Sequence, residues 1–202
     1  ALETLAGELT AAPSDWPVLK LLRRAVQAAN VALYHKRVTV PELQSLGTTV
    51  TVTAVVGRTL TAAHVGNCRL WLLRGHTLTQ LTKDHTWGRE QSQGGVLATP
   101  DPHARRYALP RCLGHELTVS VDLLTMELQA ADVLLHTSDG VHGALAEREI
   151  QELLEAHPPD AACRALVRRA HESDDRDDAS AQAAAVSRLP VPASRPWWRF
   201  GL

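Results

Sequence analysis

The sequence has 202 residues, of which 45% are hydrophobic; this suffices for one sizeable core but not for two ordinary enzyme domains. Lysine and arginine number 21 and aspartate and glutamate 22, so the formal net charge is −1 and no basic excess favours nucleic acid as a partner. Three scattered cysteines argue against a disulfide framework or a zinc site and fit a reducing cytoplasm, and no apolar run reaches the roughly 18 residues that cross a membrane.

The first half of the chain predicts two helices and then a β-meander. Apolar residues at three- and four-residue steps indicate a short helix at about 2–9 and a longer one from Trp16 to His35. After Gly47 the period changes to two, because valines alternate with threonines up to Val56, which predicts a strand. Three short β-prone runs follow, at 58–65, 69–73 and 77–81, and Arg74-Gly75 predicts a tight turn between the last two.

The second half begins with a long segment, Thr86 to Pro110, in which no period persists; we expect it to be irregular and functional. The further elements predicted are a strand pair at 117–121 and 123–128, a central strand at 132–137 that is buried on both faces, helices around 150–154 and from 158, and a final strand at 179–189.

The chain therefore reads as one domain, residues 1–189, followed by a tail, residues 190–202, that is rich in proline and tryptophan. The tail is too short for a core of its own. Its aromatic run, Trp197-Trp198-Arg199-Phe200, suits an anchor at a membrane surface, and equally a segment that folds back on the domain or hangs free. The first residue is Ala1 and not methionine, which suggests a piece of a longer or a processed gene product.

Two acidic positions are candidate ligands of a metal ion. Asp139 follows the predicted buried strand and precedes a glycine, where a carboxylate reaches the mouth of the core; the other interpretation of Ser138-Asp139-Gly140 is a simple turn. The acidic run at 174–178 precedes the final strand, and by itself it is typical of a solvated loop. Two carboxylates at two strand borders can meet around one hard divalent cation such as magnesium or manganese.

Other chemistries find less support in the sequence. It contains no G-x-x-x-x-G-K-S/T phosphate loop, no G-x-S-x-G nucleophile elbow and no H-E-x-x-H pair. His136, Asp139 and His142 are closely spaced, but the interval crosses a junction between strand and turn, which disfavours a shared zinc site.

The order of short motifs is more informative than any one of them. In the first half of the chain, Gly47-Thr48-Thr49 is similar to the element G-T-T, Val65-Gly66-Asn67-Cys68-Arg69 to V-G-D-S-R, and Leu81-Thr82-Lys83-Asp84-His85-Thr86 to L-T-x-D-H-S. In the second half, Arg111-Cys112-Leu113-Gly114 is similar to R-A-L-G, Ser138-Asp139-Gly140 to S-D-G, and Arg176-Asp177-Asp178-Ala179-Ser180 to R-D-N-x-T/S. From about Leu2 to Leu189 the chain thus resembles bacterial members of the metal-dependent protein phosphatase family, the PPM or type 2C family.

This resemblance implies an α+β fold, a four-layer α-β-β-α sandwich of two mainly antiparallel sheets flanked by helices. It also implies hydrolysis of phosphoserine and phosphothreonine in proteins by a water that two manganese or magnesium ions activate in the complete domain. Carried over residue by residue, Asp139 and Asp177 are two ligands of the first metal, with Asp178 supporting Asp177, and no catalytic side chain beyond the metal ligands is expected. The segment from Thr86 to Pro110 resembles the flap beside the substrate groove.

Two features depart from the family pattern. The upstream elements R-x-x-N-E-D and D-G-x-G-G-H, which supply the metal-bridging aspartate, have no counterpart, and Ala1 aligns just beyond them. We therefore expect an N-terminally incomplete phosphatase domain that holds at best one weakly bound ion. Asn67 stands where bacterial relatives often carry an aspartate of a third metal site, and a neutral amide binds hard cations poorly.

Two functions follow as hypotheses. The first is a cytoplasmic, monomeric Ser/Thr protein phosphatase in signal transduction that acts on phosphorylated proteins and opposes Ser/Thr kinases. The second is a catalytically inactive module with the phosphatase fold that binds phosphoproteins or partner domains.

Overall fold

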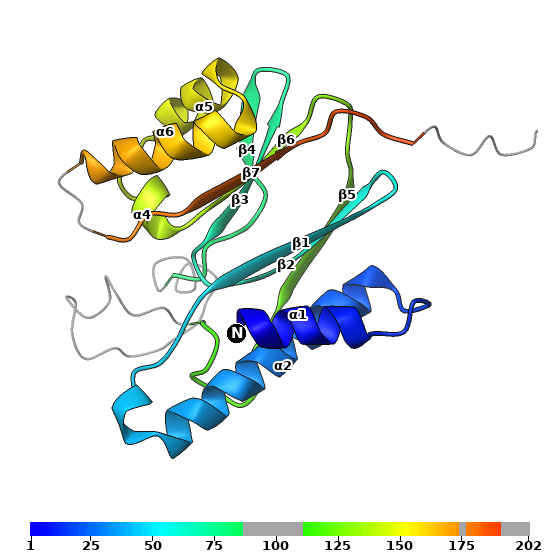
Figure 1. Cartoon of the computed structure of the whole chain (residues 1–202), viewed down its shortest axis with the longest axis vertical. Coiled ribbons are helices and arrows are strands. Elements are labelled where there is room, and N and C mark those ends of the chain that lie inside the picture. The colour runs from blue at the N-terminus through cyan, green and yellow to red at the C-terminus, as the bar shows by residue number, and fades with distance from the viewer. Residues whose placement is uncertain (87–110, 174–176, 191–202) are drawn as a thin grey trace, which may run out of the picture.

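Two β-sheets lie face to face in the computed structural model, which describes residues 1–86, 111–173 and 177–190 (Figure 1). Both sheets are antiparallel throughout their described pairings. The first sheet has the order β1-β2-β5, made by β1 (Val50–Val56), β2 (Thr59–Val65) and β5 (Asp122–Glu127). The second has the order β4-β3-β6-β7, made by β4 (Thr77–Gln80), β3 (Arg69–Arg74), β6 (Val133–Thr137) and β7 (Ala181–Ala185).

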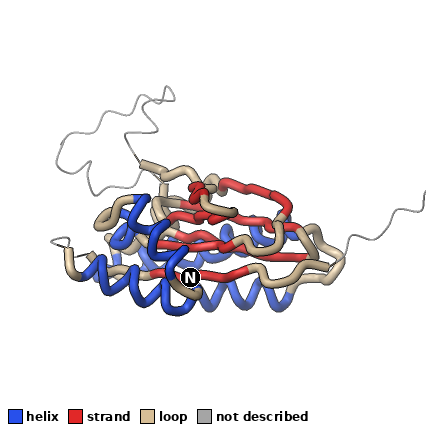
Figure 2. Tube along the Cα trace, turned by 90° about the horizontal axis from the view of Figure 1, so that it is seen from above, coloured by secondary structure: helices blue, strands red, loops and turns tan. Residues whose placement is uncertain are grey.

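Helices cover the outer face of each sheet. The first sheet packs on α1 (Leu2–Ala11) and α2 (Val18–Thr39), and the second on α5 (Glu147–Ala156) and α6 (Pro159–His171) (Figure 1). Figure 2 shows the strands of both sheets running in roughly the same direction, with the long helices beside them. The predicted four-layer α-β-β-α sandwich is confirmed. No helix in the described part of the chain combines the length and the apolarity that crossing a bilayer requires.

The alternation of residues in β1 decides which face meets the helices. Val50, Val52 and Ala54 pack with the core of α1 and α2, whereas the hydroxyls of Thr51 and Thr53 reach the histidines between the sheets. This division follows from the two-residue period of a strand, and it confirms the predicted split between valines and threonines.

Strand β6 is a central strand that is buried on both faces, as predicted. It pairs with β3 on one side and β7 on the other. Leu134 packs in the core between the sheets, and its neighbour Leu135 packs in the core beneath α5 and α6. A continuous apolar run is required where both faces of a strand meet other layers.

The layer between the sheets is apolar at one end and polar at the other. Leu60, Leu72 and Leu134 belong to its apolar cluster. At the opposite end, His64 at the end of β2 and His136 at the end of β6 are held by threonine hydroxyls of β1. Burial lowers the pKa of His136, and burial together with the nearby His85 lowers that of His64 to about 4, so both rings are neutral at pH 7.

Several predicted elements need correction. The predicted strand Leu117–Val121 is absent, and the segment predicted to pair with it, Leu123–Leu128, contributes β5, which pairs with β2 instead. The final strand is shorter than predicted, Ala181–Ala185 rather than 179–189. The structure adds a 3₁₀ turn, Pro41–Leu43, and the one-turn helix α4 (Asp139–His142), neither of which was predicted.

Three sequence predictions fall largely outside the described residues. They concern the long segment, of which 87–110 is not described, the start of the acidic run at 174–176, and the tail at 191–202.

Candidate metal centre

The pairing of β6 with β7 brings the two predicted acidic segments together. Thr137, the last residue of β6, is opposite Ala181, the first residue of β7, so the chain that leaves one strand runs beside the chain that enters the other. The Ser138 N–H donates to the Ser180 carbonyl at 3.0 Å, and the Ser180 N–H donates to Ser138 Oγ at 2.9 Å. Ser138-Asp139-Gly140 and the segment 177–180 are therefore neighbours at one end of the second sheet.

Gly140 is the point of closest approach between these segments. A Cβ atom at this position would lie 2.5 Å from the Asp178 carbonyl oxygen and 2.8 Å from its carbon. The Ser138 hydroxyl donates to the same carbonyl at 3.3 Å. Only a residue without a side chain allows the two backbones to lie this close.

Both candidate carboxylates are oriented by nearby donors. Asp139 accepts from the backbone N–H of Gly140 at 3.2 Å and from Asn67 Nδ2 at 2.9 Å. Asp177 accepts from the N–H of Asp178 at 2.9 Å. Because an ionised carboxylate has about four lone-pair positions, each group retains capacity for a further partner such as a cation.

A polar cavity of about 490 Å³ opens beside these segments, between the ends of the two sheets. Ser138 and Ser180 form part of its wall, and Thr51, Cys68, His136 and Gln182 are among its other lining residues. Burial raises the pKa of the Cys68 thiol despite its hydrogen bonds, so this thiol is protonated at neutral pH.

A partly buried ion pair supports the start of β3 behind the site. Arg69 Nη2 lies 2.6 Å from Asp84 Oδ2, and Nε lies 3.0 and 3.1 Å from the two carboxylate oxygens. Burial by itself would raise the pKa of Asp84, but the hydrogen bonds and charge of Arg69 outweigh it and hold this pKa below its usual value. The pair is a fixed support and not a titrating group at neutral pH.

A second polar cluster lies on β2 and the segment after β4. The rings of His64 and His85 are 4.8 Å apart, and His85 Nδ1 accepts from the Gly66 N–H at 2.9 Å. His85 Nε2 lies 3.2 Å from Asp122 Oδ2 and 3.0 Å from Arg111 Nη1, and Arg111 Nη1 donates to Asp122 Oδ1 at 2.9 Å. His85 and Arg111, which lie close to the two ends of the segment 87–110, are thus joined through the carboxylate of Asp122 on β5.

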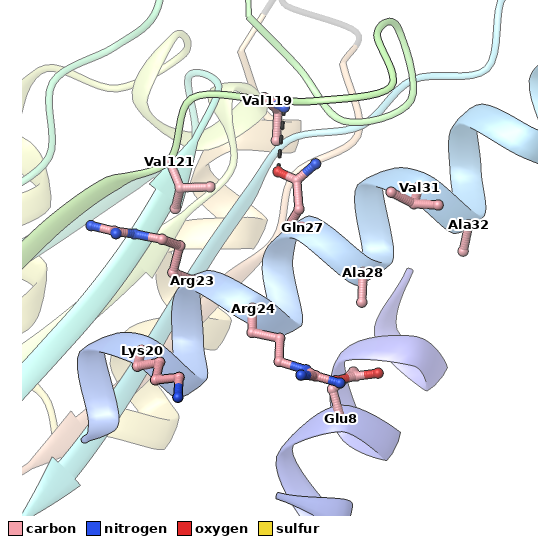
Figure 3. A pocket seen from close by; sticks show the side chains of 10 residues that line it. All are labelled: Glu8, Lys20, Arg23, Arg24, Gln27, Ala28, Val31, Ala32, Val119 and Val121. Atoms are coloured by element: carbon pink, nitrogen blue, oxygen red, sulfur yellow. Dashed lines mark hydrogen bonds and ion pairs between the residues drawn. The ribbon is translucent and has the colours of Figure 1, made fainter. Parts of the chain in front are cut away.

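A larger cavity lies away from this site. It is a groove of about 640 Å³ along α2, with Ala28, Val31 and Val119 in its apolar wall and Lys20 and Arg24 at its rim (Figure 3). The carboxylate of Glu8, which lines this groove, is already paired with Arg24 at 3.0 Å. The chemistry of metal binding therefore favours the smaller polar cavity.

The predicted site residues fit a hard divalent cation only in part. Asp139 and Asp177 supply carboxylate oxygens, the ligand type that magnesium and manganese prefer. Within the described residues, however, no three His, Cys, Asp or Glu side chains converge as a metal site requires. The two aspartates therefore provide part of a coordination shell, whose remainder would come from water or from other residues.

The histidines near the site do not form the zinc site that their spacing raised as a possibility. His136 lies between the sheets and contacts Thr53, whereas His142 lies on the opposite face of the second sheet, beside Trp71 and Thr137. Successive side chains of a strand point to opposite faces, so His136 lies on the opposite face from Thr137, which His142 contacts. The sequence pattern drew attention to Asn67 and His142 only as possible metal-site residues. The hydrogen bonds of these two side chains were not predicted.

Comparison with known proteins agrees with the fold. The family model described as Protein phosphatase 2C matches residues 3–91. The chain is 33% identical over 137 residues to the serine/threonine phosphatase stp of Listeria monocytogenes, which is 67% of this chain and 54% of that protein. It is 34% identical over 141 residues to the serine/threonine protein phosphatase PstP of Mycobacterium tuberculosis, which is 68% of this chain and 27% of that protein. The chain thus spans about half the length of the Listeria relatives that it matches.

Solved structures extend the similarity to nearly the whole chain. The crystal structure of Mycobacterium tuberculosis PstP superposes with a TM-score of 0.79 at 29% identity, covering 93% of this chain and 80% of that one. The catalytic domain of PstP in complex with two manganese ions gives a TM-score of 0.78, also at 29% identity, covering 93% and 79%. The fold is that of the metal-dependent protein phosphatases. The chain belongs to the protein phosphatase 2C family.

Proposed function

We propose that the protein is a metal-dependent serine/threonine phosphatase that hydrolyses phosphoserine and phosphothreonine in proteins. The observation that carries the proposal is the contact between Ser138-Asp139-Gly140 and the segment 177–180, which places two candidate metal ligands at one end of a sheet. The names of the Listeria and Mycobacterium relatives support the same activity.

We assign Asp139 and Asp177 as metal ligands, and the manganese in the similar PstP domain supports Mn²⁺ or Mg²⁺ as the cofactor. When bound, such ions activate water and neutralise charge that develops on the phosphoryl group. The residues of this chain hold the ligands in place. Asn67 and the Gly140 N–H fix the two oxygens of Asp139, and the Asp178 N–H orients Asp177. The neutral amide of Asn67 weakens any third metal position beside Asp139.

The remaining assignments follow from the proposed activity. We assign residues 1–189 to the phosphatase domain and 190–202 to a separate tail, and we expect a cytoplasmic monomer whose substrates are phosphoproteins, including those made by Ser/Thr kinases. The alternative is an inactive module that binds phosphoproteins or partner domains without turnover. It is favoured by the absence of three convergent ligands among the described residues.

The test is a phosphothreonine-peptide assay on the full-length protein with manganese or magnesium. Asp139→Asn removes one charged ligand and should lower kcat/KM by roughly 100-fold or more, the size of effect typical for loss of one preorganised electrostatic group. Asp160→Asn makes the same change of charge at an exposed carboxylate of α6 and should leave the rate unchanged.

Two outcomes would contradict the phosphatase assignment. Phosphate release that persists at full rate in excess chelator would exclude the metal mechanism. Binding of the phosphopeptide without release, in the presence of either metal, would establish the inactive binding module instead.

A further inference from the structure

A chain of buried hydrogen bonds runs behind Asp139. The Trp71 indole Nε1–H donates to Thr137 Oγ1 at 3.0 Å, and Thr137 Oγ1 lies 2.8 Å from His142 Nδ1. Trp71 and Thr137 are 1% and 3% exposed, so water does not compete for these groups. Indole Nε1 can only donate, so Thr137 Oγ1 accepts from Trp71, and the hydroxyl hydrogen of Thr137 is available for Nδ1 of His142.

The state of His142 agrees with this direction of the bonds. Burial, together with the positive charge of Arg69, lowers the pKa of His142 to about 4, so the ring is neutral at pH 7. With Nδ1 accepting, the ring hydrogen is on Nε2, and the backbone carbonyl of Asn67 faces the ring as an acceptor. One neutral tautomer satisfies both neighbours.

The bond between Thr137 and His142 spans the turn that carries Asp139. Thr137 ends β6 and His142 ends α4, so Ser138, Asp139 and Gly140 lie between the two bonded residues. Helix α4 has only four residues and its Ser138 N-cap makes no side-chain capping bond, so the helix alone fixes the direction of Asp139 poorly.

Asn67 provides the second hold on the same carboxylate. Its side chain donates to Asp139 Oδ2 at 2.9 Å, while its backbone carbonyl faces the His142 ring. His142 therefore contacts both segments that set the position of Asp139, namely the turn that carries it and the loop whose amide binds it.

We propose that His142 is a positioning residue, which holds Asp139 for metal binding through Thr137 and the Asn67 loop without contacting the metal. This rests on the proposed function, in which Asp139 is a metal ligand. Groups that orient metal ligands typically change metal affinity by about 10- to 100-fold when they are removed. A core residue would affect only packing and stability. His142, in contrast, also affects the position of the metal ligand Asp139.

The experiment is a calorimetric titration of the full-length protein with Mn²⁺. His142→Leu removes the acceptor and should weaken Mn²⁺ binding by about 10- to 100-fold. His142→Asn places an amide oxygen near the position of Nδ1 and should recover most of the affinity. A merely structural role would lower the melting temperature of the metal-free protein in both variants without this recovery of Mn²⁺ affinity.

A second pair of variants covers the case in which His142→Leu fails to fold. Thr137→Val keeps the shape of the side chain but removes its hydroxyl, and it should weaken Mn²⁺ binding as His142→Leu does. Thr137→Ser keeps the hydroxyl and should bind as the wild type.

The results also separate this proposal from the proposed function. If the wild type binds Mn²⁺, Asp139→Asn abolishes binding and the acceptor-free variants bind like the wild type, then the positioning role of His142 is wrong while the phosphatase assignment stands. If the wild type binds no Mn²⁺, the metal site and everything that depends on it are wrong.

Discussion

Gly140 is the residue at which the two acid-bearing segments touch, and its role is one of space. Its backbone lies in the ordinary helical region, because only Gly57, Gly66, Gly75 and Gly114 have positive φ among the described glycines. Glycine is required here because a Cβ atom would lie only 2.5 Å from the Asp178 carbonyl oxygen. That neighbour is backbone, which cannot move aside as the end of a flexible side chain can.

Gly140→Ala should therefore separate the segments of Asp139 and Asp177. We expect a lower melting temperature and weaker Mn²⁺ binding, measured by thermal denaturation and calorimetry. Gly7→Ala is the matched control, since its Cβ would meet nothing within 4 Å on helix α1. There alanine should stabilise the protein by about 0.5–1 kcal/mol through its helix propensity. Equal effects of the two substitutions would refute the steric argument.

At this scale the sequence singled out the candidate ligands but did not predict their surroundings. Asp139 and Asp177 stand out because each is at the border of a strand, which is a local property. The bonds of Asn67 to Asp139 and of Trp71 to Thr137 join residues 72 and 66 positions apart. No local period or spacing reports such contacts.

At the scale of elements, helix α2 shows both the strength and the limit of sequence patterns. Its apolar stripe predicted a helix from Trp16 to His35, and the structure has Val18–Thr39. The same helix explains why Leu117–Val121 is not a strand. Gln27 and Asn30 donate to the Leu117 carbonyl, both at 3.1 Å, and Val119 N–H donates to Gln27 at 3.3 Å. Side chains of α2 thus take the place of a partner strand.

Asn30 is the main link between α2 and this segment. It is fully buried, donates to the carbonyls of Glu116 and Leu117, and accepts from the Gly114 N–H at 2.8 Å. Asn30→Ala leaves buried backbone groups without these bonds, so we expect a loss of roughly 2–5 kcal/mol in the free energy of unfolding. Urea denaturation measures this loss.

Gln27→Ala is the control for Asn30→Ala, because it removes bonds to the same segment from a partly exposed position. It should cost about 1 kcal/mol or less, since water can replace those bonds. A loss for Asn30→Ala no larger than that for Gln27→Ala would show that burial of these bonds is unimportant.

At the scale of the whole molecule, the sandwich was predictable because its layers follow from periodicity, and the four layers were confirmed. The polar end of the layer between the sheets was not predicted. The strand alternation placed Thr51 and Thr53 away from the helices, but the histidines they meet, His64 and His136, come from other strands. Which side chains face one another across two sheets depends on register and packing, and local sequence does not encode either one.

His64 makes the stability of the sandwich dependent on pH. Its folded pKa is about 4 against an ordinary value of 6.5, so its neutral form stabilises the fold fully above pH 6.5, and this stability is lost as the pH falls toward 4. At pH 5 the loss from this one group is roughly 2 kcal/mol. His64→Gln should reduce, by about that amount, the difference in unfolding free energy between pH 7.5 and pH 5.

Denaturant unfolding at the two pH values measures the effect. The exposed His35→Gln on α2 serves as the control and should leave the difference unchanged. If His64→Gln gives the same pH dependence as the wild type, the acid sensitivity arises elsewhere.

The unequal ends of the layer between the sheets give the sandwich a direction in which it can yield. Leu60, Leu72 and Leu134 hold the sheets together at one end by burial of apolar surface. At the other end, which surrounds a cavity of about 490 Å³, the contacts between the sheets include the polar ones of Thr53 with His136 and of Thr51 with Cys68. Small separations of the sheets therefore cost least free energy at the end that carries the acidic segments. The apolar end acts as the hinge of such a movement.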